Sequence, residues 1–167
     1  MDVAGLDRLR LACDLEERLS YRLLAPELVK KTFEKVKQHL PDALRTPEAF
    51  AALYMARGSM FFEIGDFEGV FWLVNVALGH KAVGHIVLWA EKWKGKYQLA
   101  KEVIHEIFRL LNLQRLEAFI PTLNEKACKY AEKLGFTLEG VLRRFDRYDE
   151  RYVDIAVYSL LKEELDG

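Results

Sequence analysis

The sequence from Lys92 to Ala100, KWKGKYQLA, joins two regions that differ in hydrophobic pattern. Residues 59–91 before it have the pattern of strands, and the residues after it, as far as about Asn112, have the pattern of one long helix. The first turn of a helix has unpaired backbone N–H groups and a partial positive charge, and the lysines would add to that charge. The stretch therefore predicts a phosphate-binding turn at a helix N-terminus, with a solvated, lysine-rich turn as the alternative.

Hydrophobic spacing and turn residues predict strands and helices along the rest of the chain. The expected strands are 21–25, 59–64, 70–78, 82–90, 115–120, 136–142 and 152–161. The expected helices are 6–19, 26–40, 47–57, the long helix that reaches residue 112, and 122–134. Short turns favour antiparallel pairing among the strands of 59–90, and the strand–helix–strand order around the basic turn favours a parallel, right-handed crossover. The charged segment 143–151 is predicted to be a hairpin loop.

Length and composition limit the class of protein. The 167 residues predict a single domain over 1–167, and 51% hydrophobic with 31% charged residues is ordinary for a globular protein. A net charge of −1 argues against a nucleic-acid partner, and the apolar run 70–78 is too short to span a membrane. Cys13 and Cys128 form no CxxC motif, and the four histidines lack metal-ligand spacing. We therefore expect no metal, no disulfide framework and a cytoplasmic location.

The second half of the chain contains motifs with characteristic spacing. They are Asn124-Glu125-Lys126-Ala127, then EKLGF at 132–136, LEGVLR at 138–143, Asp154, and YSLL at 158–161. Together with the order of elements, they resemble the GNAT superfamily of acetyl-CoA-dependent N-acetyltransferases. They are most similar to the signature N-x-x-S/A … E-K-L-G-F-x-x-E-G-x-x-R of the RimJ/RimL-like branch, which acts on ribosomal-protein N-termini.

This resemblance implies an α/β (α+β) GNAT fold, with a mixed central sheet of about 6–7 strands and helices on both faces. It implies an acyltransferase that moves acetyl from acetyl-CoA to a primary amine, on a peptide or protein N-terminus or a small molecule, by direct attack in a ternary complex. The expected partner is the amine-bearing acceptor, and the protein would be a monomer or homodimer. The alternatives are a non-catalytic GNAT-fold module that binds CoA or a partner protein, and an unrelated α/β phosphate-binding domain.

The resemblance places the pyrophosphate motif Q/R-x-x-G-x-G/A on residues 92–97. Gly95 matches, whereas Tyr97 stands where Gly or Ala would let the backbone approach the phosphates, so its side chain must point away. The resemblance also puts a strand amide for the acetyl group near Val87 or Leu88, and the pantetheine arm between strands 82–90 and 115–120. The coenzyme contacts that it implies are Val87, Leu88, Lys92, Trp93, Lys94, Gly95, Lys96, Tyr97, Gln98, Asn124 and Ala127.

The helix at 122–134 contains the candidates for a general acid. Asn124 is either a coenzyme contact or a helix cap, in competition with a capping box that begins at Thr122. Ala131 occupies the position where many GNAT enzymes have a tyrosine that protonates the leaving thiolate. Cys128 and Tyr130 lie nearby and are candidate acids, with a place in the core as the alternative for both.

The strands before the basic turn contain the candidate bases. Glu63 and His85 could accept the proton of the attacking amine, with an ordinary strand residue as the alternative for each. Phe61 and Trp89 are candidate substrate contacts, again with a place in the core as the alternative. In the RimJ/RimL-like branch, the region that corresponds to 143–151 can border the acceptor site.

Overall fold

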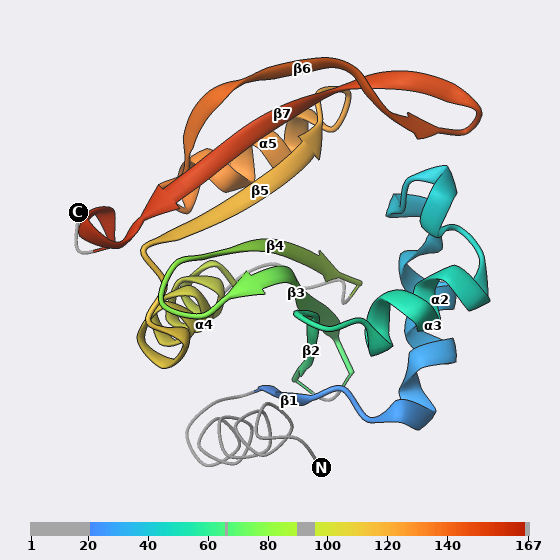
Figure 1. Cartoon of the computed structure of the whole chain (residues 1–167), viewed down its shortest axis with the longest axis horizontal. Coiled ribbons are helices and arrows are strands. Elements are labelled where there is room, and N and C mark those ends of the chain that lie inside the picture. Colours follow the sequence, from blue (N-terminus) through green and yellow to red (C-terminus); the bar gives the residue numbers. More distant parts are fainter. Residues whose placement is uncertain (1–20, 66, 90–95, 166–167) are drawn as a thin grey trace.

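A seven-stranded sheet runs through the molecule in the order β1-β2-β3-β4-β5-β7-β6 (Figure 1). The computed structural model describes residues 21–65, 67–89 and 96–165. The strands are β1 Tyr21–Leu23, β2 Met60–Ile64, β3 Gly69–Ala77, β4 Lys81–Leu88, β5 Arg115–Pro121, β6 Thr137–Tyr148 and β7 Arg151–Leu161. The predicted α/β class with a mixed central sheet is confirmed.

The α-helices of the described residues are α2 Val29–Val36, α3 Pro47–Met55, α4 Lys96–Leu111 and α5 Glu125–Lys133. Short 3₁₀ helices add η1 Pro26–Leu28, η2 Lys37–His39, η3 Asp42–Leu44 and η4 Lys162–Glu164. The single helix expected at 26–40 is therefore η1, α2 and η2 in succession, and the helix expected at 6–19 lies outside the described residues. Of the helices that the structure describes, none has the length and apolar character that a membrane span requires.

The pairing of the strands follows the expected connections. β2, β3 and β4 pair as antiparallel neighbours, with Phe62 opposite Phe71 and Phe71 opposite Ile86. The crossover through α4 makes β4 and β5 parallel, as predicted. β5 then pairs antiparallel with β7, and β7 with the outer strand β6.

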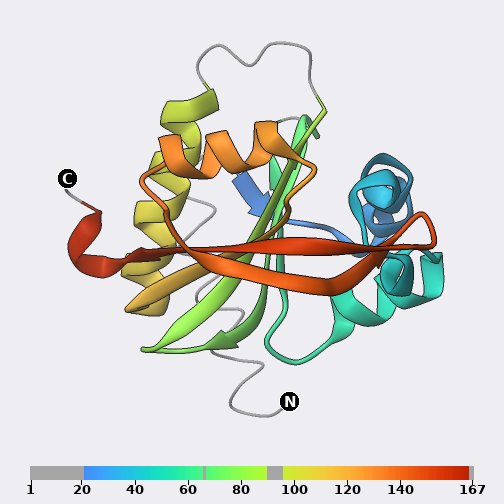
Figure 2. The same cartoon turned by 90° about the horizontal axis from the view of Figure 1, so that it is seen from above.

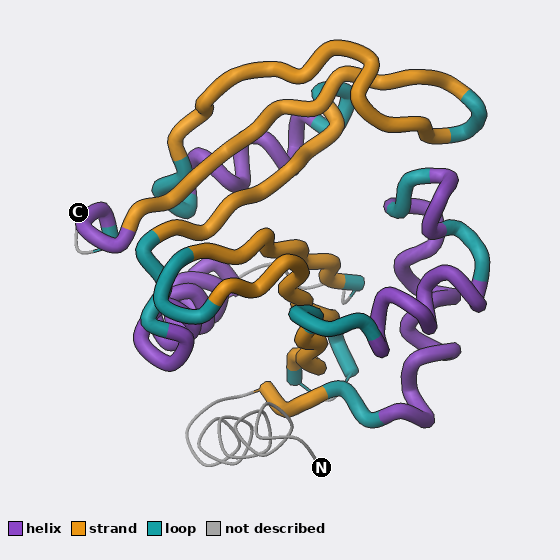
Figure 3. Tube along the Cα trace, viewed as in Figure 1, coloured by secondary structure: helices purple, strands orange, loops and turns teal. Residues whose placement is uncertain are grey.

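Helices cover both faces of the sheet, as Figures 2 and 3 show. On one face, α4 and α5 pack on alternate strand residues such as Phe62 and Phe71. On the other face, α2 and α3 pack on the intervening residues, such as Phe61 and Trp72. We call these the α4–α5 face and the α2–α3 face. Each apolar helix stripe thus has its own cluster of buried strand residues.

The segment 143–151 is not the hairpin loop that its charge predicts. β6 continues to Tyr148, β7 begins at Arg151, and the turn between them consists of Asp149 and Glu150, both with positive φ. The strand is interrupted by a bulge between Leu142 and Asp146, where Arg144 also has positive φ. The loop prediction was wrong because charged side chains are normal on an outer strand, where they face solvent and discourage further pairing.

The tip of this hairpin is tied to η3 by the carboxylate of Asp42. Asp42 accepts hydrogen bonds from the backbone N–H groups of Asp149 and Glu150, both at 3.0 Å, and from Nε of Arg147 at 3.2 Å. The guanidinium of Arg45 pairs with Asp42 and with Asp149. These contacts, which we call the Asp42 clasp, join segments more than 100 residues apart in the sequence. Desolvation raises the pKa of Asp42, but the N–H donors of Glu150 and Asp149 and the two arginines outweigh it, so the pKa is lowered.

We expect Asp42→Ala to lower the melting temperature, because the substitution removes the acceptor for the hairpin turn. A carboxylate with a lowered pKa stabilises the fold above its ordinary pKa, and this contribution is lost as the pH falls through the lowered value. The difference in melting temperature between wild type and Asp42→Ala should therefore shrink as the pH is lowered from about 7 to about 2. Glu150→Ala is the matched control, since Glu150 contributes its backbone N–H. A difference that is the same at both pH values would contradict the clasp.

Candidate active site

β4 and β5 pair along only part of their length. The pairs are Lys81 with Arg115, Ala82 with Leu116 and Val83 with Glu117, although β4 continues to Leu88 and β5 to Pro121. Beyond Val83, β4 stays paired with β3, and β5 stays paired with β7. Figure 2 shows β4, in green, turning away from β7, in red. We call the region between 84–88 and 118–121 the β4–β5 opening.

Backbone groups of both strands face this opening. The backbone N–H of Trp89 donates to the carbonyl of Glu68 at 3.1 Å. Alternate residues of β4, including Val87 and His85, therefore direct their backbone groups to β3. Because backbone groups alternate along a strand, the N–H and C=O groups of Gly84, Ile86 and Leu88 then face the opening. Of the two residues expected to supply a strand amide, Leu88 is therefore directed into the opening and Val87 is directed to β3.

The backbone of β5 alternates in the same way. Thr122 donates its N–H to the carbonyl of Asp154 at 2.9 Å, which places the even-numbered residues of β5 in the ladder with β7. The backbone N–H of Arg115 accordingly points to the β4 side, where it donates to the carbonyl of His80 at 3.1 Å. By the same alternation the N–H and C=O of Phe119 face the opening.

The predicted phosphate turn lies mostly outside the described residues, which exclude Lys92, Trp93, Lys94 and Gly95. Lys96 is the first residue of α4. The side chain of Tyr97 points toward α5, where its hydroxyl donates to the carbonyl of Lys133 at 2.7 Å. The tyrosine thus satisfies a carbonyl in the last turn of α5. Gln98 is exposed, and its side-chain amide donates a hydrogen bond to the carboxylate of Glu102, one turn along α4.

Asn124 is the N-cap of α5. Its Oδ1 accepts the backbone N–H of Ala127 at 3.2 Å, and Asn124 rather than Thr122 is the capping residue. This confirms the helix cap as one role of Asn124. The side chain is exposed, and a coenzyme contact through it, or through Ala127, stays a prediction.

The two candidate acids on α5 pack against the core under the α4–α5 face. Cys128 and Tyr130 are both partly buried there. Burial, followed by the nearby Tyr97, raises the pKa of Tyr130. Cys128 lies beside the hydroxyl of Tyr158, which donates to Glu132 at 3.0 Å, and burial together with these two neighbours raises the pKa of Tyr158. Neither candidate is brought to the edge of β4 by any contact that the structure describes, and the general acid stays unassigned.

Of the two candidate bases, His85 borders the opening and Glu63 does not. Glu63 is 2% exposed on β2, which is separated from β4 by β3. His85 lies on β4, with its imidazole stacked on Trp72 at 5.0 Å between ring centroids. Burial lowers the pKa of His85 to about 4, so the ring is neutral at pH 7 and is a weak proton acceptor.

The two expected substrate contacts are held in the core of the α2–α3 face. Phe61 is 2% exposed and stacks on Trp72, so the structure shows the place in the core that was its alternative, and a substrate contact stays a prediction. Its strand, β2, is covered by α2 and α3, which the sequence pattern could not show. Trp89 is partly buried, and its Nε1 donates to the carbonyl of Phe67 at 2.7 Å while the two rings pack together. We interpret Trp89 as a support for the end of β4.

An aromatic pair that the sequence did not indicate covers β5 on the α2–α3 face. Phe119 of β5 stacks on Phe145 of β6, with ring centroids 6.2 Å apart. Leu116, Ala118 and Ile120 pack toward α4 and α5, so Phe119 points to the opposite face. Because Phe145 belongs to the segment expected to be a loop, its place over β5 could not be predicted. The pair lies across the β4–β5 opening from His85.

Substitutions at Asn124 test its role as the cap of α5. We expect Asn124→Ala to lower the free energy of unfolding by about 1 kcal/mol, because the N–H of Ala127 loses its acceptor. Asn124→Asp keeps an acceptor at the N-cap and should unfold like the wild type. Chemical denaturation of the three proteins measures these differences. If Asn124→Asp lowered the free energy of unfolding as much as Asn124→Ala does, the side chain would not stabilise the protein through the helix cap.

Comparison with known proteins gives two sequence relatives, and no family model matches the chain. An uncharacterized N-acetyltransferase p20 of Bacillus licheniformis is 34% identical over 70 residues, which are 42% of this chain and 39% of the relative. The chain thus matches less than half of that relative's length. An uncharacterized N-acetyltransferase YoaA of Bacillus subtilis is 28% identical over 136 residues, 75% of each chain.

Solved structures share the fold. The spermidine N-acetyltransferase from Vibrio cholerae, solved in complex with CoA and spermine, superposes with a TM-score of 0.70 over 90% of this chain and 99% of its own, at 19% identity. At this level of identity, the likeness shows the fold alone. Both sequence relatives are named as N-acetyltransferases.

Proposed function

We propose that the chain transfers the acetyl group of acetyl-CoA to a primary amine. The observation that carries this proposal is the β4–β5 opening, in which two parallel strands separate and leave backbone groups of both facing each other. An exposed strand edge binds extended chains through its N–H and C=O groups. The names of the sequence relatives and the CoA in the solved neighbour support the same activity.

The residues around the opening fit acetyl-CoA. Gly84, Ile86 and Leu88 present a row of backbone donors and acceptors that suits the amide-rich arm of the coenzyme. The 16-residue helix α4 follows β4 in the chain, and its N-terminus suits the phosphates together with the predicted turn at 92–97. When bound, the coenzyme supplies an activated acetyl thioester.

The side chains and amides of this chain would then act on the two reactants. The N–H of Leu88 is directed into the opening and is the donor that we assign to the oxygen that becomes negative during attack. The acceptor enters from the α2–α3 face, where His85 and Phe119 border the opening. The amine must be neutral to attack, and a neutral His85 can accept its hydrogen bond without electrostatic repulsion.

Two observations bear on the class of acceptor. The motifs between Asn124 and Arg143 resemble those of enzymes that act on protein N-termini. The structural neighbour is named for spermidine, a small aliphatic amine. A primary aliphatic amine is common to both, and we propose that acceptor class.

Acetyl-CoA should raise the melting temperature of the protein, by an amount that corresponds to about 2.7 kcal/mol when its concentration is 100 times the dissociation constant. We expect Gly95→Trp to abolish this shift, because the indole would occupy the predicted phosphate turn. Met55→Trp is the matched control, since Met55 is 80% exposed on α3, and it should keep the shift. A shift retained in Gly95→Trp would place the phosphates elsewhere, and no shift in the wild type would contradict the proposal.

Turnover is measured as thiol release from acetyl-CoA over a panel of short peptides and small primary amines. We expect release that depends on both the protein and the amine. Binding of acetyl-CoA without release for any amine would favour the non-catalytic alternative.

A further inference from the structure

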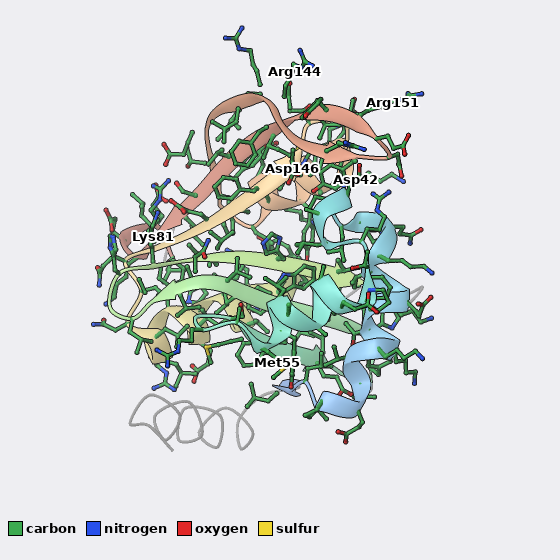
Figure 4. The ribbon with its side chains drawn as sticks, turned by 45° about the vertical axis from the view of Figure 1, so that its right-hand side comes forward. Asp42, Met55, Lys81, Arg144, Asp146 and Arg151 are labelled. Carbon is green, nitrogen blue, oxygen red and sulfur yellow. The ribbon has the colours of Figure 1, made fainter. Side chains whose placement is uncertain are left out.

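Asp146 lies where β6 rejoins the sheet after its bulge. It pairs with Val153 of β7, and side chains of directly opposed residues share a face. Ala156, Tyr158 and Leu160 of β7 pack toward α4 and α5, so Val153, at an odd position, belongs to the α2–α3 face. Asp146 therefore faces the same side as His85. Figure 4 shows it beneath the hairpin, whereas Arg144 and Arg151 project outward.

The neighbouring aromatic pair brings this part of β6 close to the opening. The ring of Phe145 lies over Phe119, whose backbone borders the β4–β5 opening. The Asp42 clasp fixes the hairpin tip that follows. Asp146 thus follows, in the chain, the residue whose ring covers Phe119, on the side from which we propose that the acceptor enters.

The described cations around Asp146 pair with other carboxylates and not with Asp146. Arg147 pairs with Asp42, and Arg45 pairs with Asp149. Asp146 accepts the backbone N–H of Arg147 at 2.8 Å, and no ion pair involves its carboxylate among residues 21–65, 67–89 and 96–165. Tyr148, on the same face, is affected by this negative charge: burial and then Asp146 raise its pKa to about 12 against the opposing effect of Arg45.

We infer that Asp146 anchors a second, cationic group of the acceptor, an inference that rests on the proposed function. A partly buried carboxylate binds an ammonium group through charge-assisted hydrogen bonds. It would not suit the reacting amine, because a nearby carboxylate favours the protonated form, which cannot attack. Phe119 and Phe145 would pack on the hydrocarbon linker and contribute cation–π attraction. The acceptor class is therefore an aliphatic amine that has a second amino group a few carbons away.

Matched acceptors test this inference. Diamines with linkers of three to six carbons are compared with monoamines in which a methyl group replaces the second amino group. For the wild type we expect kcat/KM to be at least about tenfold higher for the best diamine than for its monoamine. One charge-assisted hydrogen bond is enough to produce a factor of this size. Asp146→Asn should remove this preference, mainly through KM for the diamine, with the monoamine unaffected. Asp146→Glu should keep part of it, and Glu150→Gln, on the exposed turn, should keep all of it.

The outcomes separate the anchor from the proposed function. Equal turnover of diamine and monoamine by the wild type would overturn the anchor while the acetyl transfer stands. A preference that survives in Asp146→Asn, or an equal loss for both acceptors, would also overturn it. Titration calorimetry of the same acceptors in the presence of CoA gives a second readout that needs no turnover. Diamine binding that is lost in Asp146→Asn supports the anchor even in a protein that transfers no acetyl group, and binding that is unchanged contradicts it.

Discussion

The separation of β4 from β5 after Val83 and Glu117 is the constraint on which the site depends. Each strand is held on its other side, β4 by β3 and β5 by β7, so the two edges diverge as parts of two well-paired portions of the sheet. Backbone groups at such an edge need solvent or a bound chain as partners. Beyond Val83 and Glu117 the two strands therefore leave backbone groups that they do not pair with each other.

The α2–α3 side of the β4–β5 opening depends on contacts between segments that are distant in the sequence. β6 and β7 form a long outer hairpin, and the Asp42 clasp holds its tip against η3, far away in the sequence. The bulge before Asp146 lets Phe145 reach across to Phe119. The hairpin thus forms one wall of the α2–α3 side of the opening, with His85 and Trp72 on the opposite side.

Features that depend on local sequence could be predicted. Hydrophobic periodicity gave the strands and helices, Pro47 after Thr46 marked the start of α3, and the strand–helix–strand order gave the parallel crossover. The resemblance to the GNAT superfamily supplied the fold and the place of the opening. The expectation that the Tyr97 side chain points away from the phosphate turn also came from sequence, and in the structure its hydroxyl donates to the carbonyl of Lys133 on α5.

Features that depend on tertiary register could not be predicted. Phe61 and Glu63 were candidates for the site, but both are buried on β2. Because 143–151 is highly charged, its sequence predicted a loop. It did not indicate the paired strand that contains Phe145 and Asp146. The register between β3 and β4 decides which backbone amides of β4 face β5. No local sequence pattern specifies that register. The phosphate turn at 92–95 stays a prediction from sequence.

Amide hydrogen exchange at single residues of β4 tests the central claim most directly. If the opening binds the arm of acetyl-CoA, the N–H groups of Ile86 and Leu88 should exchange much more slowly when acetyl-CoA is added. The N–H of Val87 should change little, because it is directed to β3 in both states. Exchange that slows equally at all three residues, or at none of them, would contradict the assignment of this opening as the coenzyme site.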